Sequence, residues 1–180
     1  DVREYPLDQL RGKAGVVPQK AVLFHGTLRE NMQWGKKNAA DDEIYEALKT
    51  AQAFDFVEEK AEGLELYIQA GGKNLSGGQR QRLTIARALV RKPEILIMDD
   101  SASALDFATD ARLRKAIKER TQDMTVFIVS QRATTIRNAD QIVVLDDGAM
   151  VGCGTHKELF ENCEIYREIC LSQLSKEEVQ

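Results

Sequence analysis

A short stretch, Ser76-Gly77-Gly78-Gln79, has the residue types of an anion-binding site. Ser76 and Gln79 are spaced as a capping box, in which the serine caps a helix and the glutamine reaches back to the cap. Gly77 and Gly78 carry no Cβ, so their backbone N–H groups can come close to a phosphate. A helix that begins in this way is suited to hold an anion. Taken alone, however, Ser-Gly-Gly is also common in ordinary flexible turns.

Two adjacent carboxylates, Asp99 and Asp100, end a continuous apolar run that begins after Pro93. Such a run predicts a strand covered on both faces, and ligands of open α/β sheets bind outside the carboxyl ends of the strands. Gln19 follows a second short apolar run, at residues 13–17, and is therefore expected at such a position too. The simpler interpretations are that the acids cap the next helix and that the glutamine is a solvated loop residue.

Apolar periodicity indicates the strands that would position these residues. The run 141–145, the turn Asp146-Asp147-Gly148 and the run 149–153 together predict a hairpin. Residues 1–11 are expected to form a short polar connection. Buried strands are predicted at residues 13–17, 93–100 and 124–129, and a further strand is predicted at 141–145.

Helical spacing and capping boxes indicate the helices. After Gln79 the apolar positions continue until Pro93 stops the run. A helix is predicted at residues 41–53, and a second short helix follows from Phe54. Further helices are predicted after the capping boxes Thr27/Glu30 and Thr155/Glu158, and from Asp106 as a cap through Ile117.

The composition predicts one globular domain and excludes several function classes. The chain has 180 residues, of which 43% are hydrophobic and 30% charged, enough for one core. A net charge of -4 and a pI near 5.4 argue against a nucleic-acid partner and against a polybasic membrane surface. There is no run of about eighteen apolar residues, so any membrane role is expected from another segment or chain. The cysteines are odd in number and lack metal-ligand spacing, which predicts reduced thiols at Cys153, Cys163 and Cys170.

Several motifs together resemble one family. The string Leu-Ser-Gly-Gly-Gln-Arg-Gln-Arg at residues 75–82 resembles the signature motif of ABC-transporter ATPase domains. Val-Pro-Gln at 17–19, followed by Leu-Phe-x-Gly-Thr-Leu-x-Glu-Asn at 23–31, resembles the Q-loop region of exporter-type members. Residues 93–100 resemble the Walker B motif, and residues 101–106 resemble the D-loop. The resemblance covers essentially the whole chain, with the motifs in the family's order.

The resemblance implies an α/β P-loop NTPase (ABC ATPase) fold, with a mainly parallel sheet core and an inserted helical subdomain. On this basis residues 1–180 are expected to form a partial nucleotide-binding domain. Its core would comprise residues 1–25 and 76–153, its helical subdomain about 26–75, and its C-terminal helix 155–175. The sequence contains no Gly-x-x-x-x-Gly-Lys-Ser/Thr phosphate loop. Because the family places that loop before the Q-loop, we expect the N-terminal part of the domain to be missing from this chain.

The resemblance also implies ATP and Mg²⁺ as cofactors. Asp99 would anchor the Mg²⁺ shell with the side-chain oxygen of Gln19 as a ligand, and Asp100 would polarise the attacking water. The sequence departs from the family at two positions. Asp100 stands where active members have Glu, and Gln131 stands where they have the switch-loop His.

The implied reaction is ATP hydrolysis coupled to export, at the cytoplasmic face of the cell membrane. The expected partners are a second nucleotide-binding domain and the transmembrane domain of the same transporter, with no nucleic acid. The signature would contact ATP held by the second domain. The residues assigned to nucleotide binding are Ser76, Gly77, Gly78, Gln79, Gln19 and Asp106.

The two departures leave alternatives open. An intact signature beside weakened catalytic positions predicts a heterodimer with one sluggish and one competent site, whereas a homodimer would have to tolerate both substitutions. A non-hydrolysing regulatory half is a second alternative. A soluble ABC ATPase of the DNA-repair or chromosome-organising kind is a third, but such proteins lead one to expect long coiled-coil heptads, which the sequence lacks.

Overall fold

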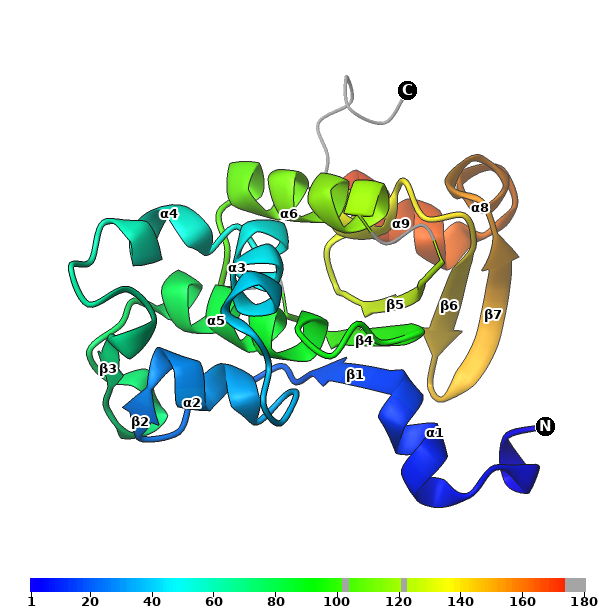
Figure 1. Cartoon of the computed structure of the whole chain (residues 1–180). Coiled ribbons are helices and arrows are strands. Elements are labelled where there is room, and N and C mark those ends of the chain that lie inside the picture. Colours follow the sequence, from blue (N-terminus) through cyan, green and yellow to red (C-terminus); the bar gives the residue numbers. More distant parts are fainter. Residues whose placement is uncertain (102–103, 121–122, 174–180) are drawn as a thin grey trace. The chain divides into compact units, whose positions relative to one another are not determined.

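The computed structural model describes residues 1–101, 104–120 and 123–173 (Figure 1). The chain divides into two compact units, Asp1–Val129 and Ser130–Gln180. Each unit has its own cluster of buried apolar side chains. No helix within the described ranges is both long and apolar enough to cross a membrane.

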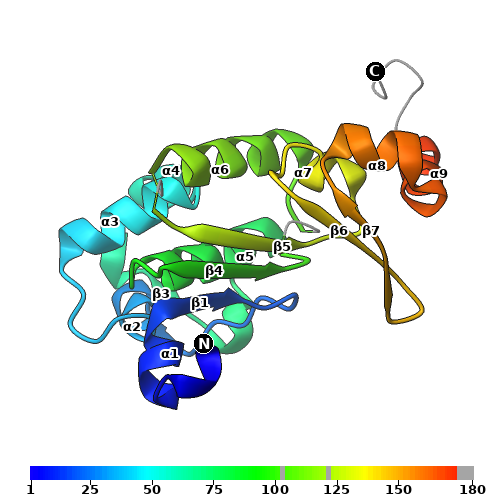
Figure 2. The same ribbon diagram turned by 90° about the vertical axis from the view of Figure 1, so that its right-hand side faces the viewer.

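The first unit contains a parallel three-stranded sheet (Figure 2). Met98, in its middle strand, pairs with Val17 on one side and Ile128 on the other. Because all strands run in the same direction, their carboxyl ends lie at one edge, which places the ends of the predicted ligand-binding strands together. The positions of the strands predicted from apolar runs are confirmed to within one or two residues. The predicted burial is wrong for the strand expected at 124–129, in which Phe127 and Val129 are each 56% exposed. In sheet order the strands are β1 (Ala14–Val17), β4 (Ile95–Asp99) and β5 (Thr125–Val129).

Long helices lie between these strands in the sequence, as parallel connections require. Helix α5 (Gly77–Leu89) precedes β4, and α6 (Phe107–Arg120) leads from β4 to β5. The end of α5 closely approaches β1 at Gly15. A Cβ on Gly15 would lie 2.9 Å from Pro93 Cγ and 3.1 Å from the Ala88 carbonyl oxygen, so only glycine fits without a shift. Helix α6 continues three residues beyond Ile117, where the predicted helix ends.

The chain between β1 and α5 forms a series of short elements. The predicted helices at 41–53 and from Phe54 are confirmed, although the first ends at Thr50. Strands β2 and β3 form an antiparallel pair that is only two residues long, which is too short for an alternation pattern to reveal. In order the elements are β2 (Gly26–Thr27), α2 (Leu28–Gln33), α3 (Asp41–Thr50), α4 (Phe54–Glu58), the 3₁₀ turn η2 (Gly63–Glu65), β3 (Tyr67–Ile68) and the 3₁₀ turn η3 (Ala70–Gly72).

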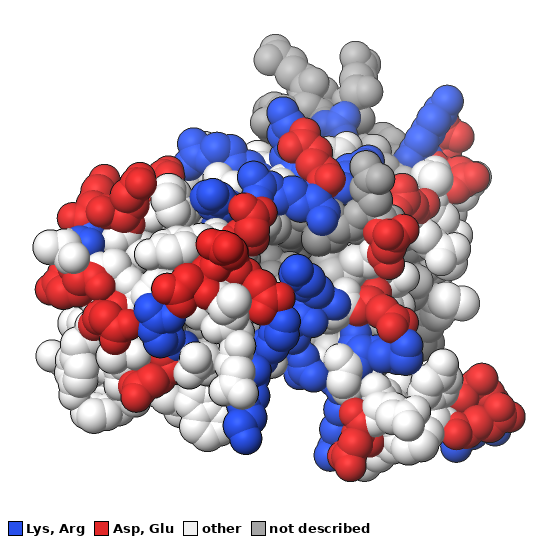
Figure 3. Space-filling model, viewed as in Figure 1, with Lys and Arg blue, Asp and Glu red and all other residues white. Residues whose placement is uncertain are grey.

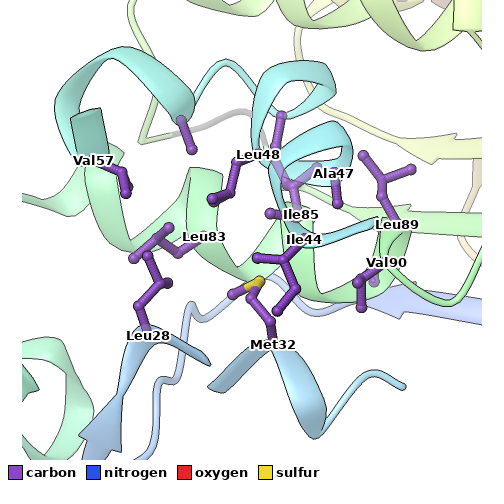
Figure 4. Packing of buried hydrophobic residues seen from close by; sticks show 14 of the residues in the cluster. Leu28, Met32, Ile44, Ala47, Leu48, Val57, Leu83, Ile85, Leu89 and Val90 are labelled. Atoms are coloured by element: carbon purple, nitrogen blue, oxygen red, sulfur yellow. The ribbon is translucent and has the colours of Figure 1, made fainter. Parts of the chain in front are cut away.

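One hydrophobic cluster joins these short elements to α5 and to the sheet (Figure 4). Leu48 of α3 and Leu83 of α5 are fully buried in it, as are Val17 of β1 and Leu96 of β4. Each fully buried aliphatic side chain stabilises the fold by about 1.5–3 kcal/mol relative to its exposed state. The helices therefore depend on the same core as the strands. Further members shown in Figure 4 are Leu28, Met32, Ile44, Ala47, Val57, Ile85, Leu89 and Val90.

The N-terminal segment corrects one prediction. The expected polar connection at residues 1–11 is instead a 3₁₀ turn, η1 (Val2–Glu4), and a helix, α1 (Leu7–Lys13). Lys13 consequently ends a helix and does not begin a strand. Helix α1 has no buried residue, and Leu7 is 57% exposed. The helix thus lacks the wide apolar stripe from which a helix is recognised in a sequence.

The second unit contains a hairpin and three helices in its described part. The predicted hairpin is confirmed: β6 (Ile142–Asp146) pairs with β7 (Ala149–Gly154). Asp147 and Gly148 have φ angles of 45° and 77°, as a tight two-residue hairpin turn requires. The helices are α7 (Ala133–Ile136), α8 (His156–Asn162) and α9 (Glu164–Gln173).

The single C-terminal helix predicted at 155–175 is interrupted. Cys163, between α8 and α9, has an extended backbone with φ -118° and ψ 108°. Both helices contribute to the core of this unit, with Leu159 from α8 and Tyr166 and Cys170 from α9. The apolar positions thus continue across the break, which is why the sequence suggested one helix. The last two residues of the prediction lie outside the described residues.

Candidate functional site

The N-terminus of α5 has the geometry that the sequence predicted. The Gln79 backbone N–H donates to Ser76 Oγ at 3.2 Å, and the Ser76 N–H donates to Gln79 Oε1 at 2.9 Å, which completes the capping box. In the described part of the chain, no group accepts a hydrogen bond from the Gly77 or Gly78 N–H. The first N–H groups of a helix lack a partner within the helix. They therefore form a place where an anion could bind.

The two glycines differ in their surroundings. A Cβ on Gly77 would meet only the Arg80 guanidinium, at 3.9 Å, within 4 Å. A Cβ on Gly78 would lie 3.4 Å from the Ala104 carbonyl oxygen and 3.8 Å from a Leu105 methyl carbon. The segment that resembles a D-loop thus contacts the start of the signature helix of the same chain at Gly78. Gly77 faces open space.

Asp106 caps α6, which was the simpler of its two predicted roles. Its Oδ1 accepts a hydrogen bond of 2.9 Å from the Thr109 backbone N–H. That hydrogen bond holds the pKa of the Asp106 carboxyl below its ordinary value, because it stabilises the ionised form. Ser101, at the start of the D-loop-like segment, is buried. Residues 102–103 of that segment lie outside the described residues.

Gln19, Asp99 and Asp100 come together at the carboxyl edge of the sheet. Asp99 is the exposed last residue of β4. Asp100 has a φ of 41°, in the left-handed region, and its N–H donates to the Val129 carbonyl at 2.9 Å. Gln19 Nε2 donates to Asp100 Oδ2 at 3.2 Å. Gln19 therefore contacts the second carboxylate through its nitrogen, and this hydrogen bond does not use its Oε1.

Gln131 belongs to the second unit. Its carbonyl oxygen accepts a hydrogen bond of 2.7 Å from Gln173 Nε2 of α9. The Ala133 N–H at the start of α7 donates to Gln173 Oε1 at 2.9 Å. Gln173 thus fixes the segment that resembles the switch loop within its own unit. The catalytic role suggested for the Gln131 side chain stays a prediction.

Asn31 organises the loop after Gln19, and sequence reasoning did not single it out. It is 1% exposed. Its Oδ1 accepts from the Phe24 N–H at 2.8 Å, and its Nδ2 donates to the carbonyls of Phe24 and Thr27 at 2.9 and 3.0 Å. A buried amide with satisfied donors and acceptor fixes the loop to α2. The available signal was a polar residue on the buried face of α2, between Leu28 and Met32.

Exposed aromatic side chains surround that loop. Phe24 and Trp34 stack with ring centroids 4.9 Å apart. The His25 Nε2 is hydrogen-bonded to the Tyr67 hydroxyl. Trp34 is 69% exposed. On the face shown in Figure 3, acidic side chains outnumber basic ones over the neighbouring α3 and α4. The aromatic surface thus lies beside a mainly acidic surface.

The comparisons with known proteins agree with this arrangement. A family model described as "ABC transporter" matches residues 1–103. The uncharacterized ABC transporter ATP-binding protein YfiB of Bacillus subtilis (strain 168) is 46% identical over 98% of this chain and 30% of its own length. The probable multidrug resistance ABC transporter ATP-binding/permease protein YheI of the same strain is 44% identical over 93% of this chain and 28% of its own length. The chain thus spans less than a third of these relatives.

A solved structure, that of a bacterial Atm1-family ABC exporter with ATP bound, has a similar fold. It superposes with a TM-score of 0.90 and 34% sequence identity, over 94% of this chain and 30% of that one. The predicted α/β ABC ATPase fold is therefore confirmed. The predicted resemblance to exporter-type members is confirmed as well.

Proposed function

This chain belongs to the ABC transporter family, and from that premise we propose that it forms part of the domain that hydrolyses ATP to drive an exporter. One observation carries the proposal. The Gly77 and Gly78 N–H groups at the capped N-terminus of α5 are open to an anion. ATP held by a second nucleotide-binding domain would place its γ-phosphate there.

The residues at the edge of the sheet fit ATP and Mg²⁺. Mg²⁺ takes oxygen ligands, commonly one or two carboxylates together with phosphate oxygens. Asp99 offers an exposed carboxylate at the end of β4, and Gln19 offers the amide oxygen that its hydrogen bond to Asp100 does not use. Mg²⁺ would neutralise the charge that develops on the transferred phosphoryl group. Asp100 would hold the attacking water, and Gln19 would orient that carboxylate.

We further propose that this domain pairs with a different nucleotide-binding domain. The acid at position 100 is an Asp, about 1.5 Å shorter in reach than a Glu, and its carboxylate already accepts a hydrogen bond from Gln19. Gln131 cannot carry the positive charge of a protonated histidine. The site that uses Asp99 and Asp100 would bind ATP and turn it over slowly, while the signature serves the competent site. A regulatory, non-hydrolysing half is the alternative that the same residues favour.

The transmembrane partner is proposed from the relatives. YheI is named an ATP-binding/permease protein, and the exposed aromatic surface around Trp34 offers an apolar area for a membrane-embedded part to contact. The domain would accordingly act at the cytoplasmic face of the membrane. The expected reaction is ATP hydrolysis coupled to export.

The Gly77→Asp variant of the transporter that contains this chain tests the proposal. We expect its ATP hydrolysis to fall to below about a tenth of the parent rate, because a carboxylate would repel the γ-phosphate. The fold should survive, since a Cβ at Gly77 has space and an acid in the first turn suits the helix dipole. Gly77→Ala is the matched control, and it should retain more activity. Parent-like hydrolysis in Gly77→Asp would show that this helix terminus is only a turn.

A further inference from the structure

The side chain of Arg80, in the first turns of α5, reaches back to the helix terminus that we propose for the γ-phosphate of ATP. Side chains on a helix point toward its N-terminus, and residues three apart are neighbours on its surface. The Arg80 Nη2 lies 3.9 Å from the position that a Cβ on Gly77 would take. A full positive charge therefore lies beside Gly77, in addition to the backbone N–H groups of the terminus.

Two backbone carbonyls hold this guanidinium in place. Arg80 Nη1 donates to the Leu75 carbonyl at 2.6 Å and to the Gly72 carbonyl at 3.3 Å. The Gly72 carbonyl also accepts from the Leu75 N–H at 3.0 Å, so both acceptors belong to one turn. Because both hydrogen bonds of the guanidinium use Nη1, neither of them occupies Nη2, the nitrogen on the side of Gly77.

The turn that supplies these carbonyls is itself fixed to other parts of the first unit. Asn74 Oδ1 accepts from the Gln69 N–H at 3.0 Å, and Asn74 Nδ2 donates to the Tyr67 carbonyl at 2.8 Å. The Gly71 N–H donates to the Leu23 carbonyl at 3.0 Å. A side chain held by a fixed turn loses less conformational freedom when it binds an anion than an unrestrained one does. Arg80 is thus prepared for such binding.

Gly72 leaves the space in which the Arg80 side chain lies. A Cβ on Gly72 would lie 2.7 Å from Arg80 Cδ and 2.8 Å from Arg80 Cγ, too close for either atom to stay in place. The φ of Gly72 is 67°, in the left-handed region. Gly71 has a similar φ of 72°, but a Cβ there would meet no described atom within 4 Å. Of these two glycines, Gly72 is the one that determines where Arg80 lies.

Within the described ranges, no ion pair compensates the charge of Arg80. Arg29, by contrast, pairs with both Asp41 and Glu65. Arg80 is half-buried, and a charge there is less screened by water and salt than a charge on an exposed side chain. It adds to the partial positive charge that the helix dipole places at the N-terminus. The terminus is therefore suited to a group with more negative charge than a carboxylate.

We propose that Arg80 is a specificity-determining residue of this site, whose fixed guanidinium favours a triphosphate over a diphosphate. ATP held by the second domain would bring its γ-phosphate to Gly77 and Gly78, where Arg80 stabilises the negative charge of that phosphate. ADP has no phosphate that reaches the terminus and gains nothing from Arg80. The inference rests on the proposed function, because it needs the γ-phosphate at the start of α5.

Nucleotide competition in the assembled transporter tests the proposal. The KM for ATP and the inhibition constant of ADP are measured for the parent and for Arg80→Met. We expect the KM for ATP to rise about threefold or more, because the charge that faces the γ-phosphate is lost, and the ADP constant to stay within about twofold. A merely structural defect would lower the fraction of active transporter, which reduces kcat and leaves both constants unchanged.

Arg80→Lys is the conservative variant, and it should recover part of the loss because it keeps the charge. An unchanged KM for ATP in Arg80→Met, or an equal change in the ADP constant, would overturn the inference. An Arg80→Lys variant that behaves like Arg80→Met would count against a role of the charge.

The two neighbouring glycines provide a test that retains the arginine. Gly72→Ala would displace the Arg80 side chain, whereas Gly71→Ala imposes a similar backbone strain without that contact. We expect Gly72→Ala to raise the KM for ATP selectively, as Arg80→Met does, and Gly71→Ala to leave it within about twofold of the parent. Combined with Arg80→Met, Gly72→Ala should add little, since the displaced group is already absent. Equal effects of the two alanines would contradict the proposal, and this comparison decides the question if Arg80→Met does not fold.

The Gly77→Asp variant separates this inference from the proposed function. If Gly77→Asp loses hydrolysis while Arg80→Met keeps the nucleotide constants of the parent, the proposed function stands and this inference fails. If Gly77→Asp retains parent-like hydrolysis, both fail.

Discussion

At the scale of single residues, Asp100 combines an unusual backbone conformation with a position beside Gln19. Its φ of 41° lies in the left-handed region, which Asp and Asn tolerate better than most residues with longer side chains. Two hydrogen bonds hold it there, from its own N–H to Val129 and from Gln19 to its carboxylate. The backbone conformation thus gives a reason for a short acid at this position, in addition to the catalytic consequence that we propose for it.

The proposed unequal sites lead to a prediction about Asp100. Losing a well-placed base costs about 10²–10⁴ in rate, but a site that is already sluggish contributes little to turnover. Asp100→Asn in the assembled transporter should therefore leave most steady-state ATP hydrolysis intact. The matched change, Glu→Gln at the corresponding position of the second domain, should abolish it. Equal losses from both changes, or full activity of a homodimer, would refute the asymmetry.

Local spacing predicted the parts of the site that lie close in the chain, and the family resemblance predicted which distant residues meet, but neither predicted the contacts between them. Ser76 and Gln79 form their capping box as expected, because it depends on three-residue spacing. The hydrogen bond between Gln19 and Asp100 joins residues 81 positions apart, and neither local spacing nor the family resemblance indicated it. Arg80 was not singled out for a similar reason: that no acid within the described ranges pairs with it is visible only once distant segments are packed together.

At the scale of elements, the loop that follows β1 depends on a single buried amide. Asn31→Ala would remove the three hydrogen bonds that fix the loop to α2 and leave the Phe24 N–H without its acceptor. We expect the free energy of unfolding to fall by about 2–4 kcal/mol. Urea unfolding of this chain measures the change. Gln33→Ala, on the same helix, is the control and should change it by less than about 0.5 kcal/mol. Because Ala has the more favourable helix propensity, similar losses in both variants would show that the hydrogen bonds of the Asn31 amide are not what stabilises the loop.

The contact between α8 and α9 predicts a pH dependence. His156 Nδ1 is hydrogen-bonded to the Tyr166 hydroxyl at 2.9 Å. Burial lowers the pKa of His156 below 6.5, and Arg137 lowers it further. Because the unfolded chain then binds the proton more readily, the contribution of His156 is fully present above pH 6.5 and is lost as the pH falls from 6.5 through the folded pKa.

His156→Gln provides the test, since glutamine does not titrate. The difference in unfolding free energy between parent and variant should stay constant above about pH 7 and shrink as the pH falls below about 6.5. His25, the other histidine of the chain, is present in both proteins, so the difference between them isolates His156. A difference that does not vary with pH would show that His156 has the same pKa in both states.

Elements with a local signature were predicted well. The capping boxes at Thr27 and Thr155 are present, because each is specified within four residues. Helix α1 was missed because it buries nothing and so has no apolar stripe. The break at Cys163 was missed for the opposite reason, since both helices face one core and the apolar spacing runs through the interruption.

At the scale of the molecule, the first unit has one hydrophobic core, and both helices and the parallel sheet pack against that core. Leu48 of α3, Leu83 of α5 and Leu96 of β4 belong to one cluster. Leu48→Ala should lower the free energy of unfolding by about 2–5 kcal/mol, and helical and sheet signals should be lost together. Far-UV circular dichroism spectra recorded during urea unfolding, resolved into helical and sheet contributions, measure both. Leu7→Ala, in the exposed face of α1, is the control; separate transitions for the two signals would show that the helices fold independently.

The order of the strands also has a consequence for synthesis. Strand β1 pairs with β4, and the paired positions are 81 residues apart. At about 5–20 residues per second, β1 leaves the ribosome roughly 4–16 s before its neighbour is complete. During that interval Val17, which is fully buried in the finished protein, has no strand beside it. A nascent chain of this protein is therefore most vulnerable to aggregation after β1 has been synthesised and before β4 is complete. Chaperones that bind extended apolar segments would bind β1 during that interval.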